Sequence, residues 1–384
     1  MDYKKYFSED VPSFMRSPVR EIFSKVNLEE ICSFAGGYPA AVTFPTDVIP
    51  GLAGKVLQKY GAKALQYGPT QGVPELRQEI AKRYEVPVSQ VQITTSSQQG
   101  IDVCSRILLD PGDIVLANNP VYLGALQSFK AYRARILPLT YYYNNADFRK
   151  DNPGKVKFIY VIPDFNNPTG ETMNLREREA LVGIARELDL IIVEDSPYRE
   201  LRYSGQEITP IRELAPERTL HLGSFSKIFA PGFRLGWIIG PEPLLEQIYV
   251  CKQCLDLCPP VFDQYLATEF LCGGALDRNL NKTIEEYRQR RDLMVSLLEK
   301  YMPSGVSWTH PQGGLFIWLT LPEHIDTVAL YEKSLAAGVA YVAGSFFYVD
   351  GSHRNTMRLN FSYIERAKME KGIKILADIL RSDV

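Results

Sequence analysis

Short apolar runs alternate with helix-like stretches through the middle of the chain, and this alternation constrains the fold more than any other feature. The runs that we interpret as strands are residues 91–94, 114–117, 158–162, 190–193 and 220–222. The second, third and fourth are nearly continuous in Ile, Val, Leu, Tyr and Phe, which is typical of strands covered by helices on both faces. The pattern predicts an α/β fold in which a mostly parallel sheet lies between helices.

Helix-start signals support this reading and divide the chain. Asn174 with Glu177 three positions later predicts an N-cap with a capping box, and Pro74 suits a first helical position. After about residue 275 we expect a long amphipathic helix over 284–301, and a last helix over 364–380. We therefore expect an N-terminal segment (1–44) that joins a small domain, a large domain (45–275) and a small C-terminal α+β domain (276–384).

Composition excludes several classes of protein. The 384 residues include 43 Lys and Arg against 45 Asp and Glu, so nucleic acid and anionic membranes are not expected as partners. The polar start lacks the apolar region of a signal peptide, and no run is long enough to span a membrane. The expected location is therefore the cytoplasm.

The 6 cysteines are expected to be reduced thiols, because a chain of this size does not rely on a disulfide framework. Cys251, Cys254 and Cys258 could suggest zinc or an iron-sulfur cluster, but a fourth ligand at a usual spacing does not follow. Their spacing instead favours one buried helical stripe. We therefore expect no metal.

Polar groups follow the expected strands, at the edge of a parallel sheet where ligands bind. The segments concerned are 96–100 (SSQQG), 119–122 (NPVY), 166–170 (NNPTG), 194–198 (EDSPY) and 223–227 (GSFSK). A serine-rich helix start offers hydroxyls and free backbone N–H groups, which suit a phosphate. Lys227 lies seven residues before Arg234. A lysine, an aspartate, a tyrosine and phosphate-binding groups at neighbouring strand ends are what a pyridoxal phosphate enzyme needs.

With these motifs, the chain resembles the fold type I pyridoxal-phosphate-dependent aminotransferases of the aspartate aminotransferase superfamily, class I and II. The motifs in family order are Ser97-Gln98-Gln99-Gly100, Asn167-Pro168-Thr169-Gly170, Asp195-x-x-Tyr198, Ser224-x-Ser226-Lys227 and Arg234-x-Gly236. The likeness extends from about Phe34 to Leu359, and Phe34-Ala35-Gly36-Gly37 leans towards the branch of 2-aminoadipate, kynurenine and broad-specificity aromatic aminotransferases. The resemblance implies pyridoxal 5'-phosphate as cofactor, bound by the large domain, and a homodimer with shared active sites.

The resemblance also implies roles for single residues. Lys227 forms the Schiff base with the cofactor and then moves the proton, Asp195 pairs with the pyridine nitrogen, and Tyr122 stacks on the ring unless it is simply core packing. Tyr198 and Asn167 bond the phenolic oxygen of the cofactor. The residues implied for the phosphate are Ser97, Gln98, Ser224, Ser226 and Arg234. Tyr67 matches a tyrosine that reaches the phosphate of the neighbouring subunit, with a buried loop tyrosine as the alternative.

For the substrate, Arg358 matches the arginine that binds the α-carboxylate, assisted by Asn167, and Gly37 lies in a loop that closes over substrate. Arg20 could meet a distal carboxylate, or could simply face water. The function implied is transfer of the amino group of an L-amino acid to a 2-oxo acid, 2-oxoglutarate being the expected acceptor. The donor is 2-aminoadipate, an aromatic or a branched-chain amino acid.

Two other functions use the same fold. A carbon-sulfur β-lyase would also need Lys227, so the motifs separate it poorly from a transferase. An effector-sensing domain of a transcription regulator would need a winged helix ahead of it, and only about thirty residues precede Phe34.

Overall fold

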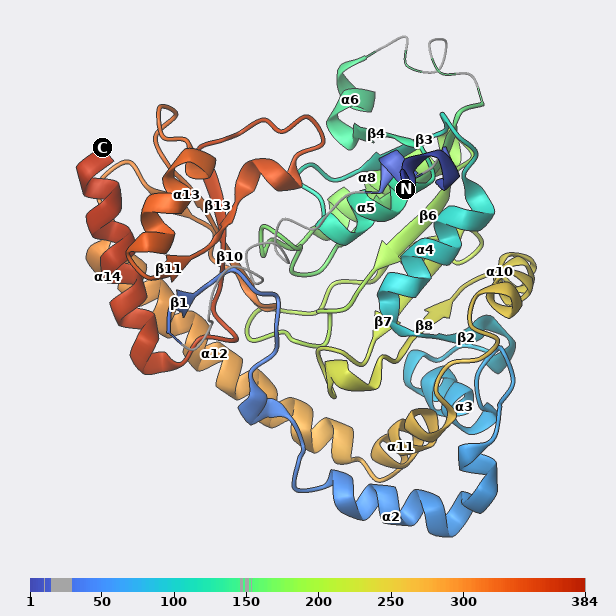
Figure 1. The fold of residues 1–384 in the computed structure, drawn as a ribbon. Coiled ribbons are helices and arrows are strands. Elements are labelled where there is room, and N and C mark those ends of the chain that lie inside the picture. Colours follow the sequence, from blue (N-terminus) through green and yellow to red (C-terminus); the bar gives the residue numbers. More distant parts are fainter. Residues whose placement is uncertain (10, 15–29, 146–147, 149–151, 153, 384) are drawn as a thin grey trace.

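Seven strands form one sheet in the order β2-β8-β7-β6-β5-β3-β4 (Figure 1). The computed structural model describes residues 1–9, 11–14, 30–145, 148, 152 and 154–383. β8 runs antiparallel to both of its neighbours, and the other neighbouring pairs are parallel. The strands are β2 (Val91–Thr94), β3 (Ile114–Ala117), β4 (Arg135–Pro138), β5 (Val156–Val161), β6 (Ile191–Asp195), β7 (Thr219–Ser224) and β8 (Gly236–Ile239).

The sheet has a helical layer on each face, as the continuous apolar runs predicted. Along β3, Val115 and Ala117 join the core that includes helices α4 and α5, whereas Ile114 and Leu116 join the core that includes α8 and α9. Successive side chains of a strand point to opposite faces, so a strand buried on both faces must be apolar throughout. The α/β fold class with a mostly parallel sheet is therefore confirmed.

The helices of this part of the chain are α2 (Ile49–Tyr60), α3 (Pro74–Tyr84), α4 (Ser96–Leu108), α5 (Leu123–Ala131), α6 (Leu139–Asn144), α8 (Leu175–Glu187), α9 (Ile211–Leu214), α10 (Glu242–Leu255) and α11 (Val261–Cys272). Short 3-10 helices are η1 (Lys4–Tyr6), η2 (Val11–Ser13), η3 (Ala41–Thr43), η4 (Gly61–Leu65), η5 (Val88–Gln90), η6 (Pro231–Phe233) and η7 (Gly344–Phe347).

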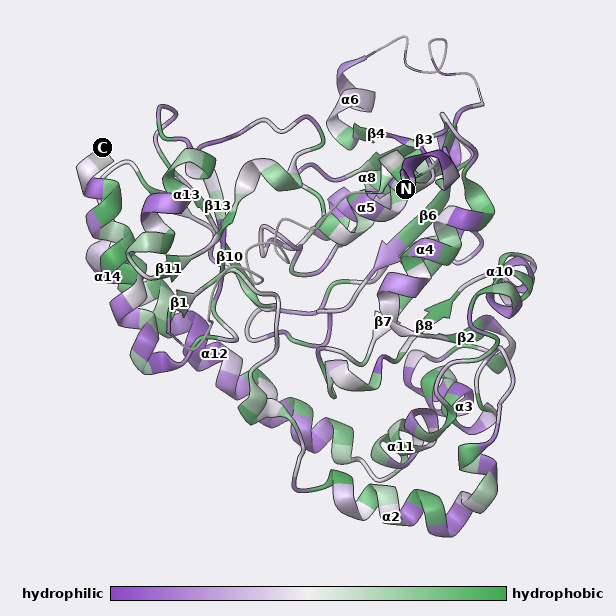
Figure 2. Cartoon of the chain, viewed as in Figure 1, coloured by the Kyte–Doolittle hydropathy of each residue, from purple (hydrophilic) through white to green (hydrophobic). Residues whose placement is uncertain are grey.

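A second group of strands gathers beyond the 27-residue helix α12 (Ala275–Tyr301), which carries both polar and apolar patches along its length (Figure 2). An antiparallel sheet has the order β12-β13-β10-β9, and β1 pairs in parallel with β11. Its elements are β1 (Cys32–Ser33), β9 (Ser307–Trp308), β10 (Phe316–Thr320), β11 (Val339–Ala340), β12 (Val342–Ala343), β13 (Thr356–Asn360), α13 (Thr327–Ala336) and α14 (Arg366–Asp383). Residues from both ends of the chain thus lie side by side.

The local signals had mixed outcomes. The capping box of Asn174 and Glu177 and the start of α3 at Pro74 are confirmed. The long helix begins at Ala275, nine residues earlier than expected, and the last helix covers residues 366–383. The sequence reading also missed β4 and β8: β4 is partly exposed and ends in a proline, and β8 begins with Gly236, a residue type that is depleted in strands.

The expectation of one buried cysteine stripe is wrong. Cys254 is exposed, and Cys258 lies beyond Leu255, the last residue of α10. A helix that stops early cannot keep a seven-residue spacing on one face. None of the helices in the described ranges combines the length and the apolar character that crossing a bilayer requires.

Candidate active site

Three neighbouring parallel strands, β5, β6 and β7, direct polar residues to one edge of the large sheet. Asp195 is the last residue of β6, Ser224 is the last of β7, and Asn167 follows β5 after a short loop. Parallel strands end at a common edge, so residues far apart in the sequence meet there. This edge forms the candidate active site.

Asp195 is a buried carboxylate with one unused oxygen. The residue is 1% exposed, and its Oδ2 accepts a hydrogen bond of 2.7 Å from the hydroxyl of Tyr160. Its Oδ1 is buried and has no hydrogen-bond partner among the described residues. Burial raises the pKa of Asp195 to about 7. An unsatisfied buried oxygen of this kind fits a ligand that brings its own N–H donor.

Lys227 lies in the loop after β7 and reaches across to the segment that follows β1. Its Nζ donates to the carbonyl oxygen of Gly37 at 2.8 Å. Burial, together with the charges of Arg234 and Arg358, lowers the pKa of the Lys227 amine to about 8. At neutral pH a minor fraction of this amine, far larger than for an ordinary lysine, is therefore uncharged and can act as a nucleophile or as a base.

Arg358 in β13 is 3% exposed and faces the same edge. Its two terminal nitrogens donate to Asn167 Oδ1 at 2.7 Å and to the carbonyl oxygen of Ala35 at 2.6 Å. The rings of Phe316 and Phe347 have their centroids 4.3 and 5.0 Å from Cζ. Burial lowers the pKa of Arg358 to about 10. In the described part of the chain, no carboxylate forms a salt bridge with this guanidinium.

Asn167 links this arginine to Tyr198. Its Nδ2 donates to the Tyr198 hydroxyl at 3.4 Å, while its Oδ1 accepts from Arg358. The pKa of Tyr198 is raised, mainly by burial, so the phenol keeps its proton. The tyrosine can therefore donate a hydrogen bond to an oxygen of a bound group.

The start of α4 and the start of β8 form a cradle of small and hydrogen-bonding groups. Arg234 donates to Ser96 Oγ at 2.6 Å, and the Oγ of Ser224 accepts from the backbone N–H of Ser226 at 3.1 Å. A Cβ at Gly236 would lie 2.7 Å from the carbonyl carbon of Ser96, so only glycine permits this approach. Helix N–H groups, hydroxyls and a guanidinium fit a phosphate.

Gln98, expected to bind the phosphate, and Tyr122, expected to stack on the cofactor ring, contact each other beside this cradle. The Tyr122 hydroxyl donates to Gln98 Oε1 at 3.2 Å, and Gln98 Nε2 donates to the carbonyl oxygen of Gly124 at 3.0 Å. Tyr122 is the N-cap residue of α5. Ser97 is half-buried in the first turn of α4. The side chain of Gln98 is therefore held by the start of α5.

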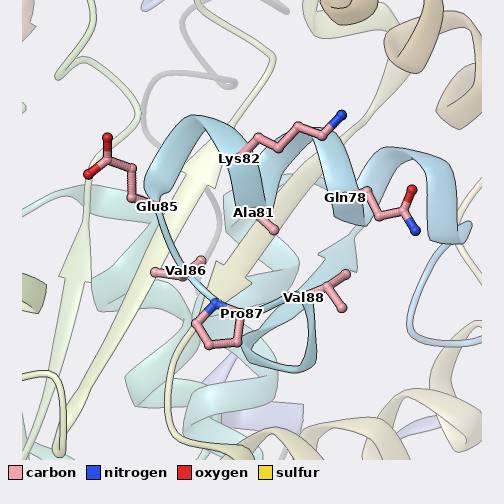
Figure 3. Close-up of a pocket in the computed structure, with 7 residues that line it drawn as sticks. All are labelled: Gln78, Ala81, Lys82, Glu85, Val86, Pro87 and Val88. Atoms are coloured by element: carbon pink, nitrogen blue, oxygen red, sulfur yellow. The ribbon is translucent and has the colours of Figure 1, made fainter.

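Two expected site residues, Tyr67 and Arg20, are not part of this cluster in the described chain. Tyr67 follows η4 and is 78% exposed, so the alternative of a buried loop tyrosine is wrong. Arg20 lies outside the described residues. A surface hollow on α3 and η5 is lined by Gln78, Ala81, Lys82, Glu85, Val86, Pro87 and Val88 (Figure 3). It adjoins the start of β2, whereas Asp195 lies at the carboxyl end of β6.

Sequence reasoning missed three residues that touch the expected ones, each hidden in an apolar run. Tyr160 bonds Asp195, and Phe316 and Phe347 cover Arg358. Ser96, which bonds Arg234, lies in the serine-rich segment expected to suit a phosphate but was not singled out. The period of two along β5 could have shown that Tyr160 points to the same face as Phe158, towards α5.

Known proteins that are similar to this chain include aminotransferases, in agreement with a site that fits pyridoxal phosphate. The family model "Aminotransferase class I and II" matches residues 45–376. The chain is 44% identical to "Aromatic-amino-acid aminotransferase 1" of Thermococcus litoralis, over 100% of this chain and 96% of the relative. It is 33% identical to the 2-aminoadipate transaminase of Thermus thermophilus, over 99% and 98%. A solved kynurenine aminotransferase of Pyrococcus horikoshii superposes with TM-score 0.95 at 40% identity, covering 100% and 98%.

The fold and the family match define a fold type I enzyme that uses pyridoxal phosphate. The unsatisfied Asp195 oxygen, the Lys227 amine and the phosphate cradle fit this cofactor. The chain belongs to the class I and II aminotransferases.

The raised pKa of Asp195 predicts that the free energy of unfolding of the cofactor-free protein depends on pH. An aspartate in an unfolded chain ionises near pH 4, so between about pH 4 and 7 the folded state holds the extra proton and stability falls as pH rises. We expect Asp195→Asn, stripped of cofactor, to melt above the wild-type temperature by a margin that is small at pH 5 and grows to several degrees at pH 8. Thermal unfolding across this range is the measurement. A difference that does not change with pH would contradict the assignment.

Proposed function

We propose that this aminotransferase moves the amino group of an aromatic L-amino acid, kynurenine or 2-aminoadipate to a 2-oxo acid, with 2-oxoglutarate as the acceptor. The observation that carries the proposal is the buried Arg358, whose guanidinium forms a salt bridge with no carboxylate in the described part of the chain. Amino donor and oxo acceptor both bring an α-carboxylate, which matches the fork of an arginine. The donor classes are those named for the relatives.

We propose the following roles for the chain's own residues. Asp195 Oδ1 accepts from the pyridine N–H of the cofactor, Tyr198 and Asn167 hold its phenolic oxygen, and Tyr122 covers one face of its ring. The phosphate is held by Ser96, Ser97, Gln98, Ser224, Ser226 and Arg234. When bound, pyridoxal phosphate supplies an electron sink that acidifies the bond at the substrate α-carbon.

Lys227 has two proposed tasks. It is the amine through which the protein bonds the cofactor, and its Nζ later accepts the proton from the substrate α-carbon. An amine with a pKa near 8 is strong enough to accept this proton and is still partly unprotonated at neutral pH. Gly37 keeps the Nζ at the edge of the site through its carbonyl oxygen.

A single-turnover experiment without acceptor tests the reaction. The cofactor-loaded enzyme is mixed with L-phenylalanine, L-kynurenine, L-2-aminoadipate, L-leucine and a cysteine conjugate. We expect one equivalent of 2-oxo acid per site, loss of the visible absorbance, and recovery of that absorbance when 2-oxoglutarate is added. Continuous formation of pyruvate and ammonia from the cysteine conjugate, with the absorbance retained, would instead show a β-lyase.

Substitution of Arg358 tests the carboxylate site. We expect Arg358→Ala to lower kcat/KM for every donor by roughly 100-fold, because about 3 kcal/mol of charge-assisted hydrogen bonding is lost. Arg358→Lys keeps the charge but not the fork, so its loss should be smaller. Cofactor affinity is the control and should stay unchanged, since Arg358 is not proposed to hold the cofactor. Equal losses in kcat/KM and cofactor affinity would contradict the role.

We also propose a homodimer in which Tyr67 reaches the phosphate of the partner's site. Its ring is 78% exposed, and Leu65 beside it is 72% exposed, which leaves an aromatic and an aliphatic side chain available for an interface.

Hybrid dimers test this proposal. Tyr67→Ala and Lys227→Ala subunits should each be defective alone, Tyr67→Ala in cofactor affinity and Lys227→Ala in amino transfer. When the two are refolded together, one intact site should form in each hybrid, with wild-type cofactor affinity. Sedimentation verifies the dimer. A monomer in solution, or hybrids without a recovered site, would rule out the shared site.

A further inference from the structure

A buried lysine outside the candidate active site joins helix α10 to helix α4. Lys252 lies in the last turn of α10 and is 0% exposed. Its Nζ donates to Gln99 Oε1 at 3.0 Å and forms an ion pair with Asp256 Oδ1 at 3.2 Å. A buried ammonium group is costly unless it is paired and hydrogen-bonded. Of its two partners, Gln99 lies in the first turns of α4 and Asp256 is the C-cap residue of α10.

The Gln99 amide connects this ion pair to the backbone at the start of α4. Its Nε2 donates to Asp256 Oδ2 at 2.6 Å, and its Oε1 also accepts the backbone N–H of Thr95 at 2.8 Å. The Thr95 hydroxyl donates to the same Asp256 oxygen at 3.0 Å. Thr95 is the N-cap residue of α4, so the lysine, the aspartate and the glutamine together hold the cap.

The residue next to this cap has an unusual backbone. Ser96 has φ of 70°, a region that serine rarely adopts and that persists only where its surroundings hold it. Its carbonyl oxygen accepts from the Thr94 hydroxyl at 3.0 Å, and its Oγ accepts from Arg234. Thr95 lies between Thr94 and Ser96 in the chain. The network of Lys252, Asp256 and Gln99 holds Thr95 in place.

We propose that Lys252, Asp256 and Gln99 are positioning residues that keep the first turn of α4 in the shape that binds the phosphate of the cofactor. The three side chains act through Thr95 and Ser96 and do not touch the phosphate themselves. The inference rests on the proposed role of the α4 start as the phosphate site.

The test compares two ligands that differ only in the phosphate. Full-length protein stripped of cofactor is titrated with pyridoxal 5'-phosphate and with pyridoxal, and the absorbance change gives each Kd. We expect Lys252→Met to raise the Kd for pyridoxal phosphate by about tenfold, the equivalent of one charge-assisted hydrogen bond, and to leave the Kd for pyridoxal unchanged. Both ligands still use Lys227 and Asp195.

Two further variants complete the test. Asp256 has a side chain 25% exposed, so Asp256→Asn disturbs the network with less risk to folding and should give the same selective loss. Gln253→Ala changes the exposed neighbour of Lys252 on α10, and should alter neither Kd. Thermal unfolding of each cofactor-free variant is measured in parallel.

The outcomes separate the positioning role from a structural one. Equal rises in both Kd values, or a lower melting temperature with both Kd values unchanged, would overturn the positioning role and leave the phosphate site intact. Wild-type protein that does not prefer pyridoxal phosphate over pyridoxal would instead overturn the proposed phosphate site, and the inference with it.

Discussion

The candidate active site is built from ionisable groups that are buried at one edge of the large sheet. Within the described residues, these groups have fewer hydrogen-bond and ion-pair partners than buried charges usually need. Asp195 keeps one unsatisfied oxygen, Arg358 has no salt-bridging carboxylate among the described residues, and burial lowers the pKa of the Lys227 amine. Removing such groups from water is unfavourable, and a fold selected for stability alone would replace them with apolar side chains. Their unmet interactions are those that a cofactor and a substrate can supply, so binding energy arises where stability is lost.

The surrounding fold keeps these groups apart and in position. Asp195 and Ser224 are held by neighbouring parallel strands, whose spacing the backbone hydrogen bonds set. Arg358 comes from the antiparallel sheet beyond α12, and it meets Asn167 only because both parts of the chain face the same edge. The rings of Phe316 and Phe347 then keep water from the guanidinium, which strengthens its hydrogen bonds.

Much of this could be predicted from the sequence, for identifiable reasons. Strands that are buried on both faces have nearly unbroken apolar sequences, so the bounds of β3, β5 and β6 could be predicted to within two residues. The polar residues that follow them had to share an edge. β8 begins with a glycine, which is depleted in strands, and the link between Lys252 and Gln99 joins residues 153 positions apart, so no local pattern marks either. Side-chain contacts between distant segments depend on packing, which a single sequence does not show.

The segment after β1 connects the two cations of the site. The Ala35 carbonyl oxygen accepts from Arg358 and the Gly37 carbonyl oxygen accepts from Lys227, although the two donors come from different sheets. In the proposed reaction, a substrate carboxylate and the cofactor use these same two donors. A carboxylate is a stronger acceptor than a peptide carbonyl, so a substrate bound as we propose would compete with Ala35 for the guanidinium. The proposed reaction therefore couples the position of residues 35–37 to what the site contains, and glycine at positions 36 and 37 leaves the backbone free of side chains there.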